Sequence, residues 1–374
     1  MGFKNITGNL QFDFQINRVL TYGEIACDEA EIMQVAKDID GLPSWFSTWY
    51  KLGEKAEKEA RFLHAAYYFR LAEFFLSEKD ENKTVIYERC IKNYHKIISK
   101  DKSVQEIFVP YQGTTMKTLI FEAESEKGTI VMFGGYDSFA EEFYLAVKAI
   151  VKNGYKVILF EGPGQGQTLK NGLTFEYRWE LPTGAILDFF NLKNVRVIGV
   201  SWGGYLALRA AAFDKRIQGV VAYDILYDGF DCMLNLLSSP ARILIRGLFA
   251  LKQRYLINSL LKLAIKKSVI ADWAITHGQY ITGTSNGYDF YNSLRNHTLK
   301  GLLSEIQCDV LLLAGEKDHY IPASHYDILM KNINNARSLK GRVFTEEEGG
   351  EQHCQVGHHE LAIDCILDWL NDFV

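Results

Sequence analysis

The stretch Val197-Ile198-Gly199-Val200-Ser201-Trp202-Gly203-Gly204 decides how the rest of the chain is interpreted. A β-branched run ends in Gly-x-Ser-x-Gly, and a segment rich in Ala and Leu follows from Tyr205 to Phe213. This order predicts a strand, a sharp turn and a helix, the context in which such a serine is a nucleophile. A serine hydroxyl is a weak nucleophile, so it needs a tight turn, a base and nearby backbone N–H donors. Glycine-bearing strand-to-helix turns also occur in other α/β proteins, so the motif by itself leaves both interpretations open.

The composition is that of an ordinary globular protein. The chain has 374 residues, 48% hydrophobic and 23% charged, which is enough for one large domain or two. A formal net charge of −5 argues against a nucleic-acid partner, which favours basic surfaces. Six cysteines lie far apart without a C-x-x-C pair, so neither a zinc site nor a disulfide framework is indicated, and no cofactor is predicted. They are Cys27, Cys90, Cys232, Cys308, Cys354 and Cys365.

The start of the chain, Met1-Gly2-Phe3-Lys4-Asn5, has no apolar signal-peptide core, and no apolar run is long enough to span a bilayer. We therefore expect a cytoplasmic enzyme without stable membrane insertion. The expected partner is a small-molecule substrate, and the sequence leaves open whether the chain forms a homodimer.

Residues 1–102 are predicted to form an N-terminal helical cap. Between residues 45 and 56, apolar side chains recur at helical spacing with charged residues on the other faces. Similar patterns predict further helices over 62–72 and 83–99. A polar linker at 100–103 then leads into a segment of different character.

Residues 103–374 are predicted to form an α/β domain. Strand patterns cover 104–110, 116–122, 129–133, 155–160, the run ending at Ser201, 217–223, 310–314 and 342–345, and the last helix is expected at 360–373. Strands that alternate with helices imply a mostly parallel sheet with helices on both faces. Ligands of such sheets bind at the carboxyl ends of the strands, where each motif of this chain falls.

Residues from about 225 to 305 interrupt this alternation. They are apolar with interspersed cations (Arg242, Arg246, Lys252, Arg254 and Lys262). One interpretation is a helical lid inserted over the active site, flanked on both sides by catalytic elements. The other is a basic amphipathic helix on a membrane surface.

A serine nucleophile needs a base, and the base needs an orienting carboxylate. In α/β-hydrolases these follow in the order Ser, Asp or Glu, then His. Asp318 comes just beyond the strand 310–314 and is the predicted orienter; Glu316 is the competing carboxylate. His353 lies in a glycine-led loop before the last helix and is the predicted base.

Neighbouring residues compete for the same role. His358 and His359 are expected to open the last helix, and Cys354 is expected to be a buried small residue.

The oxyanion hole needs two backbone donors. The N–H of Trp202 is the first, and the loop after Phe133 should supply the second, from Tyr136 or Gly135. Gly135 and Asp137 are the predicted substrate-binding residues, although Asp137 could instead cap the following helix.

Several motifs in order make the chain resemble the FrsA-like α/β-hydrolases. They are Gly134-Gly135-Tyr136-Asp137-Ser138 with Glu141-Glu142, Glu161-Gly162-Pro163-Gly164-Gln165-Gly166, Gly199-Val200-Ser201-Trp202-Gly203-Gly204, Trp273 with His277-Gly278, and His353-Cys354-Gln355. This family includes 2,6-dihydroxypseudooxynicotine hydrolase, polyketide-shortening hydrolases and acylaminoacyl-peptidase-like proteins. The resemblance covers nearly the whole chain and implies that Ser201, Asp318 and His353 form the triad.

The resemblance implies a serine hydrolase that cleaves an ester or a ketone-adjacent C–C bond through an acyl-enzyme. One C–C hydrolase of the family uses an extra carboxylate in the lid region, for which Asp228 and Asp231 are the candidates here. Two alternatives are kept. One is an acylaminoacyl- or dipeptidyl-peptidase-like exopeptidase, and the other is a non-catalytic binding protein on a hydrolase scaffold.

Overall fold

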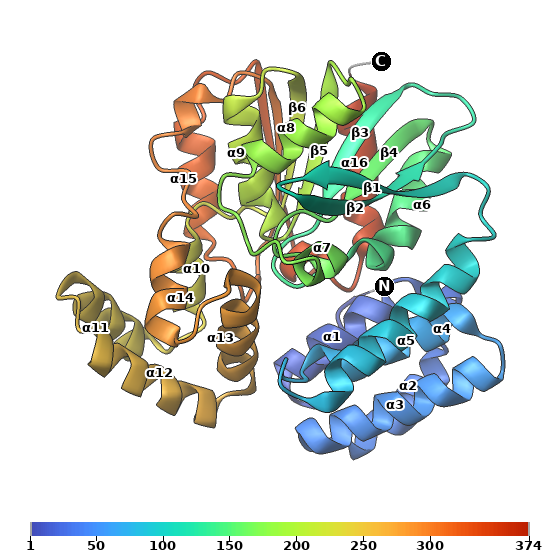
Figure 1. Ribbon diagram of the computed structural model, residues 1–374, viewed down its shortest axis with the longest axis vertical. Coiled ribbons are helices and arrows are strands. Elements are labelled where there is room, and N and C mark those ends of the chain that lie inside the picture. Colours follow the sequence, from blue (N-terminus) through green and yellow to red (C-terminus); the bar gives the residue numbers. More distant parts are fainter. Residues whose placement is uncertain (1, 373–374) are drawn as a thin grey trace.

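One sheet crosses the molecule, in a computed structural model that describes residues 2–372. In that range the sheet has eight strands in the order β1-β2-β4-β3-β5-β6-β7-β8 (Figure 1). The strands are β1 Val104–Tyr111, β2 Thr114–Phe121, β3 Gly128–Phe133, β4 Tyr155–Phe160, β5 Val195–Val200, β6 Ile217–Tyr223, β7 Asp309–Gly315 and β8 Ser338–Phe344. β1 and β2 form an antiparallel hairpin, β2 is antiparallel to β4, and the other neighbours are parallel. The predicted mostly parallel sheet is confirmed.

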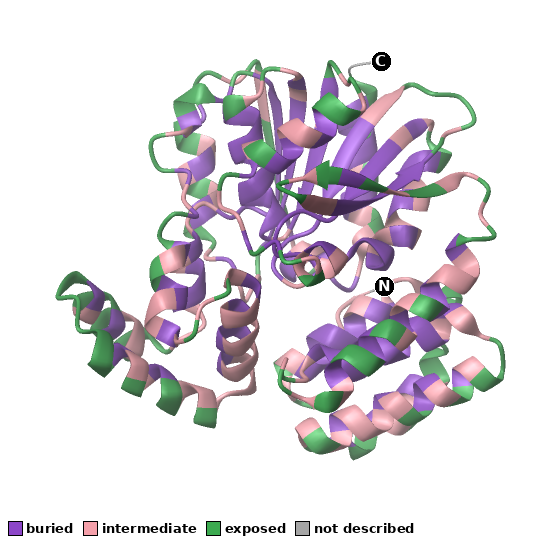
Figure 2. Ribbon diagram, in the orientation of Figure 1, coloured by how far each residue is buried: buried purple, intermediate pink, exposed green. Residues whose placement is uncertain are grey.

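Helices cover both faces of this sheet, and each face has its own apolar core. One face carries α6 (Tyr144–Lys152) and α16 (His359–Asn371). The other carries α8 (Glu180–Phe189) and α9 (Gly203–Phe213). Strand β7 is buried along its entire length, as Figure 2 shows for the centre of the sheet. A strand covered on both faces has no reason to alternate apolar and polar residues, which explains its continuous run of leucines.

The N-terminal segment is helical, and its helices lie together beside the sheet (Figure 1). They are α1 Leu10–Leu20, α2 Glu29–Val35, α3 Leu42–Lys58, α4 Phe62–Phe74 and α5 Glu81–Ile98. Helices α3, α4 and α5 pack consecutively against one another. Their amphipathic patterns had predicted all three.

Helix α1 was not predicted from the sequence. Phe12, Phe14 and Ile16 alternate with Asp13 and Gln15, a pattern more typical of a strand, yet all five side chains are buried. Its stripe at helical spacing (Phe12, Ile16, Val19 and Leu20) packs into the core, but the interleaved apolar and polar residues of 12–16 hide that stripe.

The insertion predicted at about 225–305 consists of helices, namely α10 Gly229–Asn235, α11 Ser239–Ala250, α12 Arg254–Lys267, α13 Val269–Thr282 and α14 Gly287–Leu294. Helices α11 and α12 project away from the sheet (Figure 1). They expose large apolar side chains, with Ile243 73% and Tyr255 82% accessible. The helical part of the prediction is confirmed.

Two boundaries differ from the predicted ones. β8 begins at Ser338 and not near Arg342, because most of it is an exposed edge strand whose polar residues hide the pattern. The last helix begins at His359 and is described to Asn371; its predicted end at Phe373 lies outside the described residues. Across residues 2–372, no helix combines the length and the apolar character that crossing a membrane requires.

Candidate active site

Ser201 lies at the sharp turn between β5 and α9. Its φ is +63°, a left-handed conformation that a non-glycine residue adopts only when the surroundings enforce it. A side chain on Gly199 would overlap the carbonyl of Gly203, so the turn closes only with glycine there. The motif thus holds the serine hydroxyl out at the carboxyl edge of the sheet.

The hydroxyl of Ser201 meets an imidazole. His353 Nε2 lies 2.8 Å from Ser201 Oγ, and His353 Nδ1 lies 2.7 Å from Asp318 Oδ2. The other oxygen of Asp318 accepts the N–H groups of Tyr320 at 2.8 Å and Ile321 at 2.9 Å. The structure brings together the three residues that the sequence predicted as nucleophile, base and orienter.

The electrostatics of this chain of contacts suit proton transfer. Burial raises the pKa of Asp318, but His353 and the backbone donors outweigh burial and hold the pKa below its ordinary value. Burial lowers the pKa of His353, but the facing carboxylates outweigh it and raise the pKa well above that of a free histidine. The carboxylate therefore stays ionised and stabilises a protonated imidazole.

The competing residues take no part in this chain of contacts. Glu316 is exposed and accepts the N–H of Glu346 at 2.7 Å. His358 contacts the carbonyl of Glu348 at 2.8 Å. Burial raises the pKa of Cys354, which keeps it a thiol.

A second carboxylate that the sequence analysis missed lies beside the imidazole. Asp224 follows β6 directly, is 0% exposed, and has its Oδ2 3.1 Å from His353 Nδ1. Burial and the nearby Asp318 raise the pKa of Asp224 to about 6. Two carboxylates therefore face one ring nitrogen.

Two backbone N–H groups near Ser201 are unpaired. Among the described residues, neither the N–H of Trp202 nor that of Tyr136 donates a hydrogen bond. The N–H of Gly135, in contrast, donates to Ser138 Oγ at 3.0 Å. Of the two alternatives for the second oxyanion donor, only Tyr136 is available.

The loop that carries Tyr136 is held from two sides. Gln165 donates its amide to the carbonyls of Gly134 at 2.8 Å and Gly135 at 3.1 Å. The Tyr136 hydroxyl donates to the carbonyl of Ala274 at 2.5 Å, and His277 Nε2 lies 3.1 Å from the Tyr136 carbonyl. The motifs around Gln165 and His277 thus fix the position of the loop after β3.

A cavity of about 140 Å³ opens onto Ser201. Its lining is mainly apolar and comes from α1, α4, the loop after β3 and the insertion: Phe14, Phe74, Tyr136, Leu226, Met233 and Trp273 are examples. The two helical segments, far apart in sequence, therefore shape one pocket.

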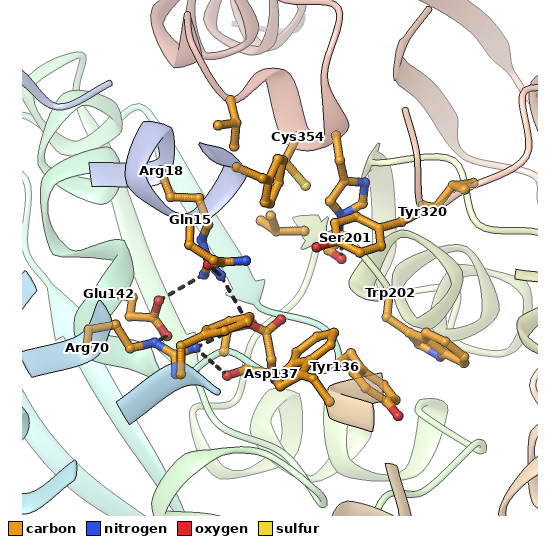
Figure 3. A pocket seen from close by; sticks show the side chains of 18 of the residues that line it. Gln15, Arg18, Arg70, Tyr136, Asp137, Glu142, Ser201, Trp202, Tyr320 and Cys354 are labelled. Carbon is orange, nitrogen blue, oxygen red and sulfur yellow. Dashed lines mark hydrogen bonds and ion pairs between the residues drawn. The ribbon is translucent and has the colours of Figure 1, made fainter. Parts of the chain in front are cut away.

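Charged side chains form the wall opposite Ser201 (Figure 3). Arg18 binds Asp137 at 3.1 Å and Glu142 at 2.9 Å, and Arg70 binds the same two carboxylates, each at 3.1 Å. Asp137 thus lines the pocket and does not cap a helix.

Gln15 lies beside this cluster and is only 2% exposed. Its amide oxygen accepts from Arg18 at 2.9 Å. Since a guanidinium only donates, the amide nitrogen of Gln15 is turned away from Arg18. No hydrogen bond from that nitrogen is found within residues 2–372.

Three predicted residues are not part of this cavity. Gly135 does not line it. Asp228 caps α10 by accepting the N–H of Asp231 at 2.9 Å, and Asp231 pairs with Arg246 at 2.5 Å. Neither candidate for a lid carboxylate therefore reaches Ser201 in this structure.

Sequence reasoning missed Arg18, Arg70 and Asp224. The one available signal for Asp224 was its position directly after a buried strand. Asp318 was predicted from a similar position, just beyond the end of another strand. The two arginines lie on helices remote in sequence from Ser201 and carry no comparable mark.

Comparisons with known proteins agree with this geometry. The family model described as "alpha/beta hydrolase fold" matches residues 130–242. The alpha/beta hydrolase psoB of Aspergillus fumigatus is 27% identical, covering 96% of this chain and 92% of its own length. The 20-hydroxy-prefusarin hydrolase FUS2 of Gibberella moniliformis is 24% identical, covering 96% of each chain.

Solved structures show the same fold. The 2,6-dihydroxy-pseudo-oxynicotine hydrolase matches with a TM-score of 0.72 at 18% identity, over 96% of this chain and 95% of its own. AbyA5 matches with a TM-score of 0.67 at 17% identity, over 97% of this chain and 100% of its own. These matches include the N-terminal helices and the insertion. The chain therefore has the α/β-hydrolase fold and is an enzyme similar to these hydrolases.

Proposed function

We propose that the protein is a serine hydrolase that cleaves a small carbonyl substrate, an ester or a ketone-adjacent C–C bond, through an acyl-enzyme. The observation that carries the proposal is the contact of Ser201 Oγ with His353 Nε2 at 2.8 Å inside an apolar cavity. His353 accepts the proton of Ser201 as the hydroxyl attacks the carbonyl carbon. Asp318 holds the ring in the tautomer that leaves Nε2 free to accept.

The negative charge of the tetrahedral intermediate develops on the former carbonyl oxygen. The unpaired N–H groups of Trp202 and Tyr136 are the donors for it. The protonated His353 then donates to the leaving group, which departs and leaves an acyl group on Ser201. Water, deprotonated by His353, attacks the acyl carbon; the bond from that carbon to Ser201 Oγ then breaks, His353 returns the proton to Oγ, and the carboxylic acid departs.

The pocket favours a neutral substrate with an apolar body. Asp137 and Glu142 are balanced by Arg18 and Arg70, so the wall presents polar groups without net charge. The unpaired amide nitrogen of Gln15 is a donor for an oxygen of such a substrate.

The same balance counts against the exopeptidase alternative. Recognition of a free amino terminus needs unneutralised carboxylates, and both acidic side chains of the wall already face guanidinium groups. The names of the relatives, which include 20-hydroxy-prefusarin hydrolase and 2,6-dihydroxy-pseudo-oxynicotine hydrolase, support small organic substrates.

A fluorophosphonate probe tests the proposal, because it reacts only with an activated serine. We expect the wild-type protein to be labelled once, at Ser201, and Ser201→Ala to remain unlabelled. We also expect Ser201→Ala to lower ester turnover by up to about 10⁶-fold. A folded wild-type protein that resists the probe would instead support a non-catalytic binding protein on this scaffold.

Two substrates with the same acyl group separate the two reaction types. One is a p-nitrophenyl ester and the other a 1,3-diketone, and both yield the same carboxylic acid. Release of that acid from the diketone by wild type, and not by Ser201→Ala, would establish C–C cleavage. Turnover of the ester alone would establish an esterase.

A further inference from the structure

Asp224 and Asp318 follow two neighbouring parallel strands, and both carboxylates lie beside His353. β6 and β7 are neighbours in the sheet, and Asp224 follows β6 while Asp318 follows β7. Because the carboxyl ends of parallel strands share one edge, both side chains arrive at the same place. His353 Nδ1 donates its hydrogen bond to Asp318 at 2.7 Å and lies 3.1 Å from Asp224 Oδ2.

We infer that Asp224 is a second orienting carboxylate for His353, able to hold the imidazole when Asp318 is lost. This inference rests on the proposed function, since it concerns the base of that reaction. Asp224 acts through His353 and touches no substrate, so it is a positioning residue.

The contacts of Asp224 favour this role over a purely structural one. Its Oδ2 accepts the N–H of Cys354 at 2.8 Å, which places the carboxylate against the backbone next to His353. Its Oδ1 is buried and has no hydrogen-bond partner among the described residues. A carboxylate kept only to fix the Cys354 loop would be a costly choice, because a neutral amide oxygen would accept the same N–H without burying a charge.

The acids differ in how firmly they are held. Two backbone N–H groups fix Asp318 in addition to His353, whereas one fixes Asp224. Asp318 is therefore the primary partner of the ring, and Asp224 supplements its charge. When Ser201 transfers its proton, two carboxylates stabilise the imidazolium instead of one.

The second charge also affects the protonation of the free enzyme. The titratable side chains facing His353 are Asp224, Cys232, Asp318, His319, Tyr320 and Cys354. Of these, Asp318, Cys354 and Asp224 raise the pKa of His353, and the carboxylate of Asp224 does so through its contact with Nδ1. Removing the charge of Asp224 should lower that pKa, and the acid limb of the pH–rate profile should move to lower pH.

The test uses the second-order rate constant for reaction of the full chain with the fluorophosphonate probe, measured against pH. The variants are Asp224→Asn, Asp318→Asn and the double variant, since Asn keeps an acceptor for the Cys354 N–H. The control is Asp309→Asn, a buried acid at the opposite end of β7, paired with Arg337.

Loss of a sole orienting acid costs about 10⁴-fold in rate. We expect Asp318→Asn to lose only about 100-fold and the double variant about 10⁴-fold, because Asp224 still faces the ring in the single variant. We expect Asp224→Asn to lose about 10-fold and to shift the acid limb downward, and Asp309→Asn to leave the profile in place.

Equal rates for Asp318→Asn and the double variant would overturn the inference, as would an unshifted acid limb in Asp224→Asn. If Asp224→Asn lowers Tm more than Asp309→Asn does, the rates of the variants that lack Asp224 no longer report on its role, and Asp318→Asn alone decides. A rate loss near 10⁴-fold in Asp318→Asn then overturns the inference, and a loss of about 100-fold supports it. A wild-type protein that never reacts with the probe refutes the proposed function itself, which separates the two failures.

Discussion

A Cβ atom on Gly135 would lie 2.6 Å from the backbone nitrogen of Trp202, closer than real Cβ atoms approach. The loops after β3 and β5 therefore meet at this point, between the two unpaired N–H groups proposed as oxyanion donors. Because these donors are backbone atoms, they cannot be removed by changing their own side chains. Gly135 offers a way to displace them.

We expect Gly135→Ala to slow both probe labelling and ester turnover by about 100- to 1000-fold, the usual effect of losing one oxyanion donor. The methyl group must push the Trp202 amide away from the position it holds. Gly128→Ala, at the start of β3 with no neighbouring atom closer than 3.9 Å, is the matched control and should keep full activity. Normal labelling of Gly135→Ala would show that these donors do not serve the reaction.

Gly199→Ala should damage stability as well as activity. Its methyl group would overlap the Gly203 carbonyl, and such overpacking typically costs about 1–3 kcal/mol. We expect a lower Tm in thermal unfolding together with loss of labelling at Ser201. Gly247→Ala in α11 meets no atom within 4 Å and should leave Tm unchanged or raise it. An unchanged Tm for Gly199→Ala would contradict the tight turn.

Replacing Arg70 should destabilise the fold. Its guanidinium contacts Glu73 at 2.6 Å, together with Asp137 and Glu142, and Arg70→Met would leave buried carboxylates with too few partners. Breaking a buried pair in this way costs about 3–5 kcal/mol. Urea unfolding should show this loss for Arg70→Met and almost none for Arg178→Met, whose pair with Glu176 is at the surface. Equal stability of the two variants would mean that the cluster does not support the fold.

The free energy of unfolding should decrease at acidic pH because Glu73 becomes protonated. Burial raises the pKa of this carboxyl, but Lys83 and Arg70 outweigh burial and hold the pKa at about 2. Since the folded pKa is below the ordinary value of 4.5, the contribution is present above pH 4.5 and is lost as pH falls toward 2. It is on the order of 3 kcal/mol.

Urea unfolding of wild type and Glu73→Gln at several pH values checks this. The difference between their free energies of unfolding should be largest above pH 4.5 and shrink steadily below it. A difference that stays constant between pH 6 and pH 3 would show that Glu73 is not held ionised by its neighbours.

The sequence by itself determined the sheet and the meeting of Ser201, Asp318 and His353. Parallel strands bring their carboxyl ends to one edge, so residues that follow the strands are brought to the same side of the sheet. Amphipathic helices such as α3 were equally predictable, because one apolar stripe with charged faces is a local pattern.

Only the tertiary structure decided what surrounds those three residues. The apolar stripe of helix α1 is a local pattern, but nothing local revealed that its polar residues Gln15 and Arg18 face the cavity and not the solvent. The pairing of Arg70 with Asp137 joins residues 67 positions apart, and the approach of Asp224 to His353 depends on how two loops close. Such contacts are set by the packing of whole elements, and the pattern of any one segment does not encode them.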